Sequence, residues 1–256
     1  MNLIKSTSFI FSAIVIMASC TSKPKTDEAK VSEAEEVTEV SGTELAVNKQ
    51  EATMEWVGTK PTGRHYGEIA LAEGDLKLSD DKLAGGKLVF NINEISVTDL
   101  KDDPESHDKL VGHLQSDDFF DAANHPKATF EIVSVKALNT AENVADEYDA
   151  YSKQMEQPAE GEKIMEVDEY KLAGATHEIT GNLTMRGKKL AITVPAVINI
   201  SEDSVQAYTN FSIDRTKWGL MYGDESKAVD KAKDKFIYNT VGVGFKLNAD
   251  RKAAQM

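Results

Sequence analysis

The sequence predicts an all-β protein, built as an antiparallel sandwich or barrel. Between residues 53 and 247, about eight or nine segments alternate apolar and polar side chains with the period of two that a strand requires. Short connections rich in Gly and Asp join many of these segments. No helix separates successive strands in the way that a parallel sheet needs, so the strands are expected to pair with their neighbours in the chain.

The N-terminus carries the pattern of a secretion signal. Lys5 precedes an apolar run over 9–18, which has the length of a signal peptide and is too short to span a bilayer. Small residues then lead into Cys20, the only cysteine of the chain. This pattern resembles a bacterial lipobox, which implies cleavage before Cys20 and a diacylglyceryl group on its thiol; an ordinary secretory signal with an incidental Cys20 is the alternative. We therefore predict a lipoprotein signal peptide over 1–19.

Acidic residues outnumber basic ones, 43 to 29, which gives a net charge of −14. This charge disfavours nucleic acid as a partner and disfavours electrostatic adhesion to anionic lipid head groups. The chain is expected to be a cell-envelope lipoprotein on the periplasmic side or the outer-membrane surface, held to the membrane by its lipid anchor only. Residues 20–46 are rich in Thr, Ser, Glu and Lys and hold no aromatic residue, which predicts a flexible acidic tether. The folded domain is expected over 47–249, followed by a C-terminal tail over 250–256.

The first strands alternate most clearly and are expected over 53–58, 68–78 and 87–95. Residues 63–67, Gly-Arg-His-Tyr-Gly, are expected to form the turn between the first two. Later strands are expected over 128–132, 178–185, 190–200, 204–213 and 240–247. The predicted inward faces of all these strands carry Met54, Trp56, Ile69, Leu71, Leu88, Phe90, Ile92, Phe130, Ile132, Leu183, Met185, Ile192, Val194, Phe211, Val243 and Phe245.

Two segments interrupt the strands. Pro104 can open a helix, and Leu110 and Leu114 stand four residues apart on one of its faces, which predicts a short helix near 104–115. Phe119 and Phe120 follow it, and we expect this pair to plug one corner of the fold. Residues 139–173 contain apolar residues at helical spacing within an acidic stretch, which predicts a partly helical insertion packed on the surface.

Several motifs occur in an order that resembles the YceI-like family of secreted lipid-binding β proteins. They are Trp56-Val57-Gly58 with Gly63-Arg64-His65-Tyr66-Gly67, Gly85-Gly86-Lys87-Leu88-Val89-Phe90, His113-Leu114-Gln115-Ser116-Asp117-Asp118-Phe119-Phe120-Asp121, His125-Pro126-Lys127-Ala128-Thr129-Phe130, Gly181-Asn182-Leu183-Thr184-Met185-Arg186-Gly187 and Phe211-Ser212-Ile213-Asp214-Arg215-Thr216-Lys217-Trp218-Gly219. The resemblance implies an eight-stranded, lipocalin-like antiparallel barrel. It also implies a lumen that holds a long isoprenoid, such as a polyprenol or an isoprenoid quinone. The insertion at 139–173 departs from the family core.

The resemblance favours a non-enzymatic carrier or store of an isoprenoid or similar amphipathic lipid. Each CH₂ group that moves from water into an apolar lumen contributes about 0.8 kcal/mol, so a long chain binds without specific bonds. The sixteen inward residues named above are then the candidate ligand-binding residues; their alternative role is to form a filled core. A second hypothesis is a structural lipoprotein with a filled barrel, which binds a protein partner through the acidic insertion. A homodimer is compatible with either hypothesis.

Catalysis and metal binding have weaker support, and we predict no enzymatic activity, no metal and no resident cofactor. His113, Asp117, Asp118, Asp121 and His125 are suitable ligand types, but their spacing matches no compact zinc motif. No Ser lies in a GxSxG motif. A hydrolase or metal site near His113 and His125 therefore stands as a third hypothesis. Arg215 can pair with a ligand head group or, as its position at a strand end favours, with a carboxylate that closes the barrel.

Overall fold

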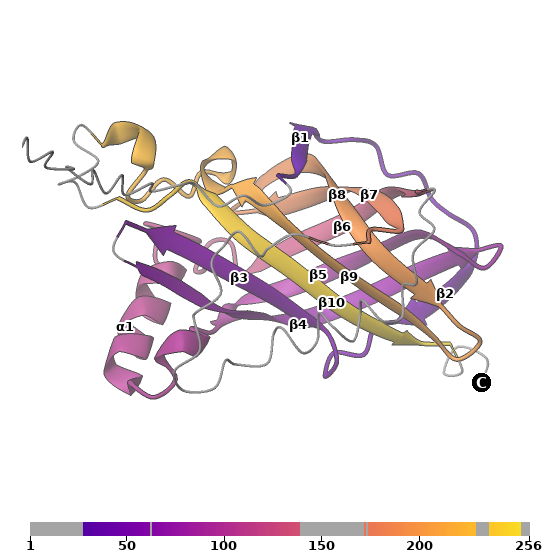
Figure 1. Cartoon of the computed structure of the whole chain (residues 1–256), viewed down its shortest axis with the longest axis horizontal. Coiled ribbons are helices and arrows are strands. Elements are labelled where there is room, and N and C mark those ends of the chain that lie inside the picture. The colour runs from indigo at the N-terminus through magenta and orange to yellow at the C-terminus, as the bar shows by residue number, and fades with distance from the viewer. Residues whose placement is uncertain (1–27, 62, 139–171, 173, 229–235, 252–256) are drawn as a thin grey trace, which may run out of the picture.

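Eight strands close into an antiparallel barrel in the computed structural model, which describes residues 28–61, 63–138, 172, 174–228 and 236–251 (Figure 1). Each barrel strand pairs with the next along the chain, and the last pairs with the first, which confirms the predicted fold class. In order around the barrel they are β3 (Thr53–Lys60), β4 (Gly63–Ser79), β5 (Lys82–Ile95), β6 (Lys127–Ala137), β7 (His177–Met185), β8 (Lys188–Ile200), β9 (Ser204–Asp214) and β10 (Thr240–Asp250).

Two further strands lie outside this ring and come from the segment that was expected to be a flexible tether. Where β8 and β9 diverge, β1 (Lys30–Glu33) pairs with β8, and the amide of Ala29 donates to the carbonyl of Ser212 on β9 over 2.9 Å. The second, β2 (Thr43–Ala46), pairs with β4. The prediction of a flexible tether over 20–46 is therefore wrong for residues 30–33 and 43–46, which form strands. Leu45 is only 1% exposed, but a four-residue strand is too short to show a period in the sequence.

A helix and its following loop lie at one end of the barrel. The helix α1 (Pro104–Gln115) has Pro104 in its first turn, and the side chain of Asp103 caps it by accepting from the amide of Ser106 over 3.2 Å. This confirms the predicted helix at 104–115. In Figure 1, α1 lies beside the end of β3 and the start of β4. A one-turn helix, η1 (Thr98–Leu100), precedes α1.

The remaining connections are short helical turns and tight hairpins. After β9 come η3 (Arg215–Trp218) and η4 (Glu225–Lys227). The predicted insertion lies outside the described residues apart from Leu172, which is buried, and residues 1–27 and 252–256 also lie outside them. Among the described residues, no helix is long and apolar enough to cross a membrane.

Four phenylalanines form an aromatic layer across the barrel interior. The ring centroid of Phe245 lies 5.3 Å from that of Phe90, 6.1 Å from that of Phe130 and 5.9 Å from that of Phe211. All four side chains are buried. Two cavities of different size lie inside the barrel, and Phe245 lines both of them. The aromatic layer therefore lies between the two cavities.

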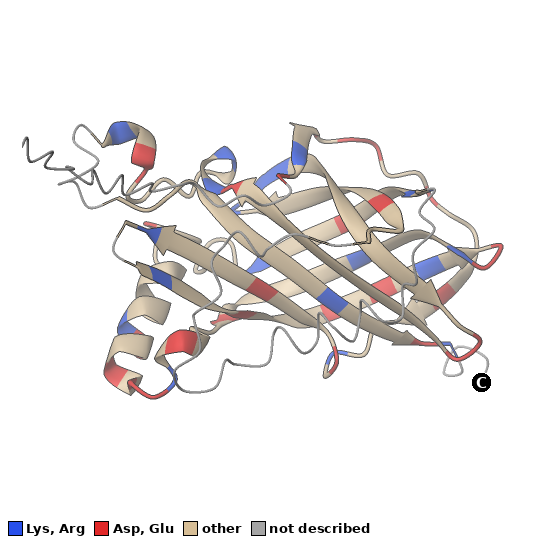
Figure 2. Ribbon diagram, viewed as in Figure 1, with Lys and Arg blue, Asp and Glu red and all other residues tan. Residues whose placement is uncertain are grey.

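Charged residues of both signs are spread over the strands of the barrel (Figure 2). Glu131 on β6 accepts from Lys189 over 2.8 Å and lies 3.2 Å from the Nζ of Lys87. The hydrogen bond from Lys189 is the largest cause that lowers the pKa of Glu131, and Lys87 lowers it further. These ion pairs link β6 to β5 and, across β7, to β8.

Candidate ligand cavity

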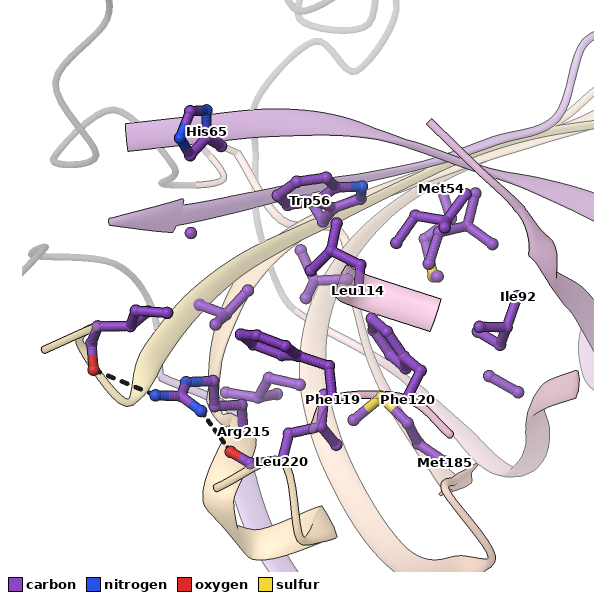
Figure 3. Close-up of a pocket in the computed structure, with 18 of the residues that line it drawn as sticks. Met54, Trp56, His65, Ile92, Leu114, Phe119, Phe120, Met185, Arg215 and Leu220 are labelled. Carbon is purple, nitrogen blue, oxygen red and sulfur yellow. Dashed lines mark hydrogen bonds between the residues drawn. The ribbon is translucent and has the colours of Figure 1, made fainter. Parts of the chain in front are cut away.

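A cavity of about 310 Å³ occupies the half of the barrel between the aromatic layer and α1 (Figure 3). This volume is at the lower end of the roughly 300–1,000 Å³ that is usual for small-molecule sites. Its lining comes from seven of the barrel strands, from α1, from the loop after α1 and from the connection between β9 and β10. The lining residues are Met54, Trp56, Gly58, Thr59, Lys60, His65, Ile69, Ile92, Ile95, Leu110, His113, Leu114, Phe119, Phe120, Ala128, Leu183, Met185, Ile213, Arg215, Leu220, Tyr222, Ile237, Val241, Val243 and Phe245.

The cavity has an apolar end and a polar end. Its deep wall holds residues such as Met54, Ile92 and Met185, which are all buried. In Figure 3 these three lie on the opposite side of the cavity from His65 and Arg215. The most solvent-exposed lining residues are Lys60 and Tyr222, and Tyr222 is 45% exposed. The mouth therefore lies at the polar end.

The loop after α1 supplies part of the cavity wall. The Phe119 ring is 6% exposed, and Phe119 and Phe120 both line the cavity. The pair therefore lies at this end of the barrel but does not fill its interior. Arg186, in the tight turn between β7 and β8, fixes the loop by donating to the carbonyls of Phe119 over 2.6 Å and Asp117 over 2.7 Å. It also donates to the carbonyl of Gly219 over 3.1 Å, so one side chain ties both loops together.

Three aromatic rings pack together where the mouth opens. The ring of His113 meets that of Tyr222 edge to face at 4.5 Å and that of Phe119 at 5.1 Å. Phe119 and Tyr222 lie 5.4 Å apart. The Nε2 of His113 lies 3.2 Å from the carboxylate of Asp118, which orients the imidazole from outside the cavity.

On the other side of the mouth, Asp99 holds His65 in place. The Nδ1 of His65 lies 2.8 Å from one oxygen of Asp99, and the other oxygen accepts from the amide of Tyr66 over 2.8 Å. Residues 63–67 were expected to form a turn, but they belong to β4, which begins at Gly63. His65 was not predicted to be a cavity residue, because Gly63 and Gly67 on either side of it indicated a turn and not a strand.

Arg215 is a buried cation in the cavity wall, with 3% of its surface exposed. Its guanidinium donates to three main-chain carbonyls: Tyr238 over 3.3 Å, Ile237 over 3.2 Å, and Leu220. Burial lowers the pKa of Arg215, and the nearby negative charges of Asp224, Asp214 and Glu225 oppose this shift.

The carboxylate pairing expected for Arg215 is not present. Among the described residues, no carboxylate lies within ion-pair distance of its guanidinium. Asp214 instead accepts from the amide of Thr216 over 2.9 Å and so caps η3. Neighbouring Trp218 is structural, because its indole donates to the carbonyl of Leu183 over 3.0 Å and is 1% exposed.

The sixteen predicted lumen residues are all in the barrel, and they separate into three groups. Half of them line the large cavity: Met54, Trp56, Ile69, Ile92, Leu183, Met185, Val243 and Phe245. Four others line a smaller cavity of about 30 Å³ on the far side of the aromatic layer: Leu88, Phe130, Ile132 and Val194. The last four are buried but line neither cavity: Leu71, Phe90, Ile192 and Phe211. Their roles in ligand binding stay a prediction.

The histidines that suggested a metal site have separate partners. His113 contacts Asp118, whereas His125 lies 4.0 Å from Asp121 and packs beneath the turn at Gly187. Among the described residues, no group of three or more His, Cys, Asp or Glu side chains is arranged to hold a metal ion. The arrangement at the mouth therefore offers contacts to a ligand and shows no cluster of ligating groups.

The geometry is that of a barrel with an internal apolar cavity open at one end, the class to which carriers of small hydrophobic ligands belong. The model of the YceI-like domain matches residues 44–249. The chain therefore belongs to the YceI-like family.

Solved structures agree with this assignment at the level of the fold. BcnA from Burkholderia cenocepacia is similar with a TM-score of 0.52 and 17% identity, covering 79% of this chain and 99% of that one. A polyisoprenoid-binding domain from Saccharophagus degradans, implicated in plant cell wall breakdown, is similar with a TM-score of 0.51 and 15% identity, covering 82% and 99%. No curated protein matches the sequence.

Proposed function

We propose that the protein binds the apolar chain of an isoprenoid or similar amphipathic lipid in the cavity between α1 and the aromatic layer. The observation that carries the proposal is the cavity itself: its interior is lined by apolar side chains, and its polar residues gather at the mouth. The structural neighbour from Saccharophagus degradans is a polyisoprenoid-binding domain, which supports the isoprenoid class. Such binding requires no chemical step, so we propose a carrier or store without enzymatic activity.

The driving force is the removal of apolar surface from water. At about 0.8 kcal/mol for each CH₂ group, a chain of roughly ten buried carbons supplies about 8 kcal/mol before the costs of association. The cavity is small for a long isoprenoid, and the Phe245 ring stands between it and the smaller cavity. We infer that a longer chain is accommodated when Phe245 changes rotamer and joins the two spaces.

The proposal includes a lipid anchor at Cys20, which would place the protein on the cell-envelope membrane. The described chain begins close to the cavity, because Glu28 bridges to Ser212 on β9, next to the lining residue Ile213. About eight residues separate Cys20 from Glu28, and a fully extended segment of that length spans roughly 26–29 Å at most. An anchored protein would thus keep its ligand cavity close to the membrane from which the lipid comes.

Organic extraction of purified protein, followed by mass spectrometry, tests the proposal. We expect one amphipathic lipid per protein molecule, recovered from protein made in several expression hosts or after incubation with isoprenoid-containing vesicles. Absence of bound lipid in every host, together with no uptake from vesicles, would exclude the carrier function. The same spectrum of the intact mature protein reports whether Cys20 carries a diacylglyceryl group.

A further inference from the structure

The cavity has a charge that is opposite in sign to that of the chain. The chain carries a net charge of −14, yet among the described residues that line the cavity there are two cations, Lys60 and Arg215, and no Asp or Glu. Asp99 and Asp118, which contact the imidazoles of His65 and His113, do not line the cavity. The excess of positive charge in the lining is therefore local to this cavity.

The polar residues of the lining also gather at one end of the cavity. Thr59 and Lys60 lie at the end of β3, and His65 lies near the start of β4. Figure 2 shows basic residues at these ends of both strands. Met54 lies near the other end of β3 and Ile69 lies further along β4, and both are buried. A bound amphiphile that matches this gradient has its tail against the aromatic layer and its polar head at the mouth.

Arg215 has hydrogen-bonding capacity that the protein does not use. A guanidinium carries five N–H groups, and the three carbonyls that accept from Arg215 leave two of them with no acceptor among the described residues. A buried charge is costly unless it is paired, and Arg215 has no carboxylate within ion-pair distance there. Two parallel N–H groups suit the two oxygens of a carboxylate or a phosphate.

Resting on the proposed function, we propose that the cavity selects amphiphiles with an anionic head group, a carboxylate or a phosphate monoester, seated against Arg215 with Lys60 at the entrance. The head group adds a counter-charge in direct contact with Arg215, whose nearby carboxylates include Asp214 and Asp224. Lys60 is exposed, so it attracts the anion from solution and contributes less to its final affinity. The apolar chain supplies the larger part of the binding energy, and the head group sets the preference among chains of equal length.

Two matched pairs of ligands test this preference by calorimetric titration of the mature protein below the micelle concentration. The pairs are geranylgeranyl phosphate with geranylgeraniol, and hexadecanoate with hexadecanol. We expect the anion of at least one pair to bind tenfold or more tightly than its alcohol, a difference of about 1.4 kcal/mol. A preference for both anions supports a general anion site, and a preference for one identifies the head group. Equal affinities within both pairs would overturn the proposal and leave the proposed function standing, whereas failure of all four ligands to bind would overturn the function itself.

Variants of the cations separate the two roles. Arg215→Lys keeps the charge but loses the paired N–H groups of the guanidinium, so we expect it to reduce the ratio of anion affinity to alcohol affinity at least fivefold. Lys60→Gln should lower anion affinity severalfold and slow anion association. Lys217→Gln is the matched control, since Lys217 lies in the same short helix as Arg215 and does not line the cavity. If Arg215→Lys does not fold, the two matched ligand pairs still decide whether the cavity prefers anions, and an unchanged rate of anion association in Lys60→Gln would contradict the role of Lys60.

Discussion

The ring centroids of Phe90 and Phe245 lie 5.3 Å apart, and Phe245 borders both cavities of the barrel. We therefore expect Phe245 to limit the depth to which a bound chain extends. Beyond the ring, the interior narrows to a space of about 30 Å³.

Shortening the side chain at Phe245 should lengthen the accepted ligand. We expect Phe245→Leu to join the two cavities and to shift the preferred isoprenoid alcohol to a longer chain, with a loss of about 1–2 kcal/mol in the free energy of unfolding. Titration with alcohols of increasing length measures the shift. Phe211→Leu is the control, because Phe211 is equally buried but lines neither cavity. The same chain-length profile in both variants would show that Phe245 does not limit the depth.

The segment over 28–46 should stabilise the fold. Leu45 on β2 is 1% exposed, so Leu45→Ala is expected to cost about 2–4 kcal/mol in the free energy of unfolding. Val37 in the same segment is 43% exposed, and Val37→Ala is expected to change this energy by less than about 0.5 kcal/mol. Urea unfolding measures both. If both substitutions changed the free energy of unfolding by the same small amount, the segment would not stabilise the fold and would act as a tether.

Arg186 should control the rigidity of the cavity wall. Arg186→Gln removes the charged donor from the carbonyls of Asp117, Phe119 and Gly219, and hydrogen bonds from charged groups contribute about 1.5–3 kcal/mol each without being additive. We expect faster amide hydrogen exchange at residues 117–120 and a faster release of bound lipid. Lys188→Gln, in an exposed position two residues away, should change neither rate.

Asp224 should make stability depend on pH in the acid range. Hydrogen bonds from Asn239 and Ser226 lower the pKa of Asp224 to about 2 in the folded protein. Because this pKa lies below the value of 3.8 for a free carboxyl, the stabilisation is fully present above about pH 4 and is lost as the pH falls towards 2. Melting temperatures of the parent protein and of Asp224→Asn are therefore expected to converge over that interval. A constant difference between pH 5 and pH 2 would mean that the Asp224 carboxylate is not stabilised by folding.

The alternation of apolar residues was sufficient to predict the barrel strands, and a Pro with two Leu at helical spacing was sufficient to predict α1. These signals are local, because each depends on residues within one element. The four-residue strands β1 and β2 were not predictable, since their pairing depends on distant partners such as Leu76 for Leu45.

The cavity itself was only partly predictable. Alternation identified inward residues such as Met54 and Met185, but whether the interior is open or filled depends on how side chains from opposite strands meet. Phe245 decides this through its contacts with three other phenylalanines from different strands. The partners of Arg215 are main-chain carbonyls, which leave no signal in the sequence.

The central claim, that the cavity is the lipid site, is tested most directly by filling it. Ala128 is a small lining residue on β6, so Ala128→Phe places a ring in the cavity. We measure the binding of geranylgeraniol by calorimetry and the folded state by thermal melting. We expect one bound molecule per molecule of the parent protein. In an Ala128→Phe protein that still melts cooperatively, we expect at least a tenfold loss of affinity for geranylgeraniol. Unchanged affinity in that folded variant would contradict the central claim.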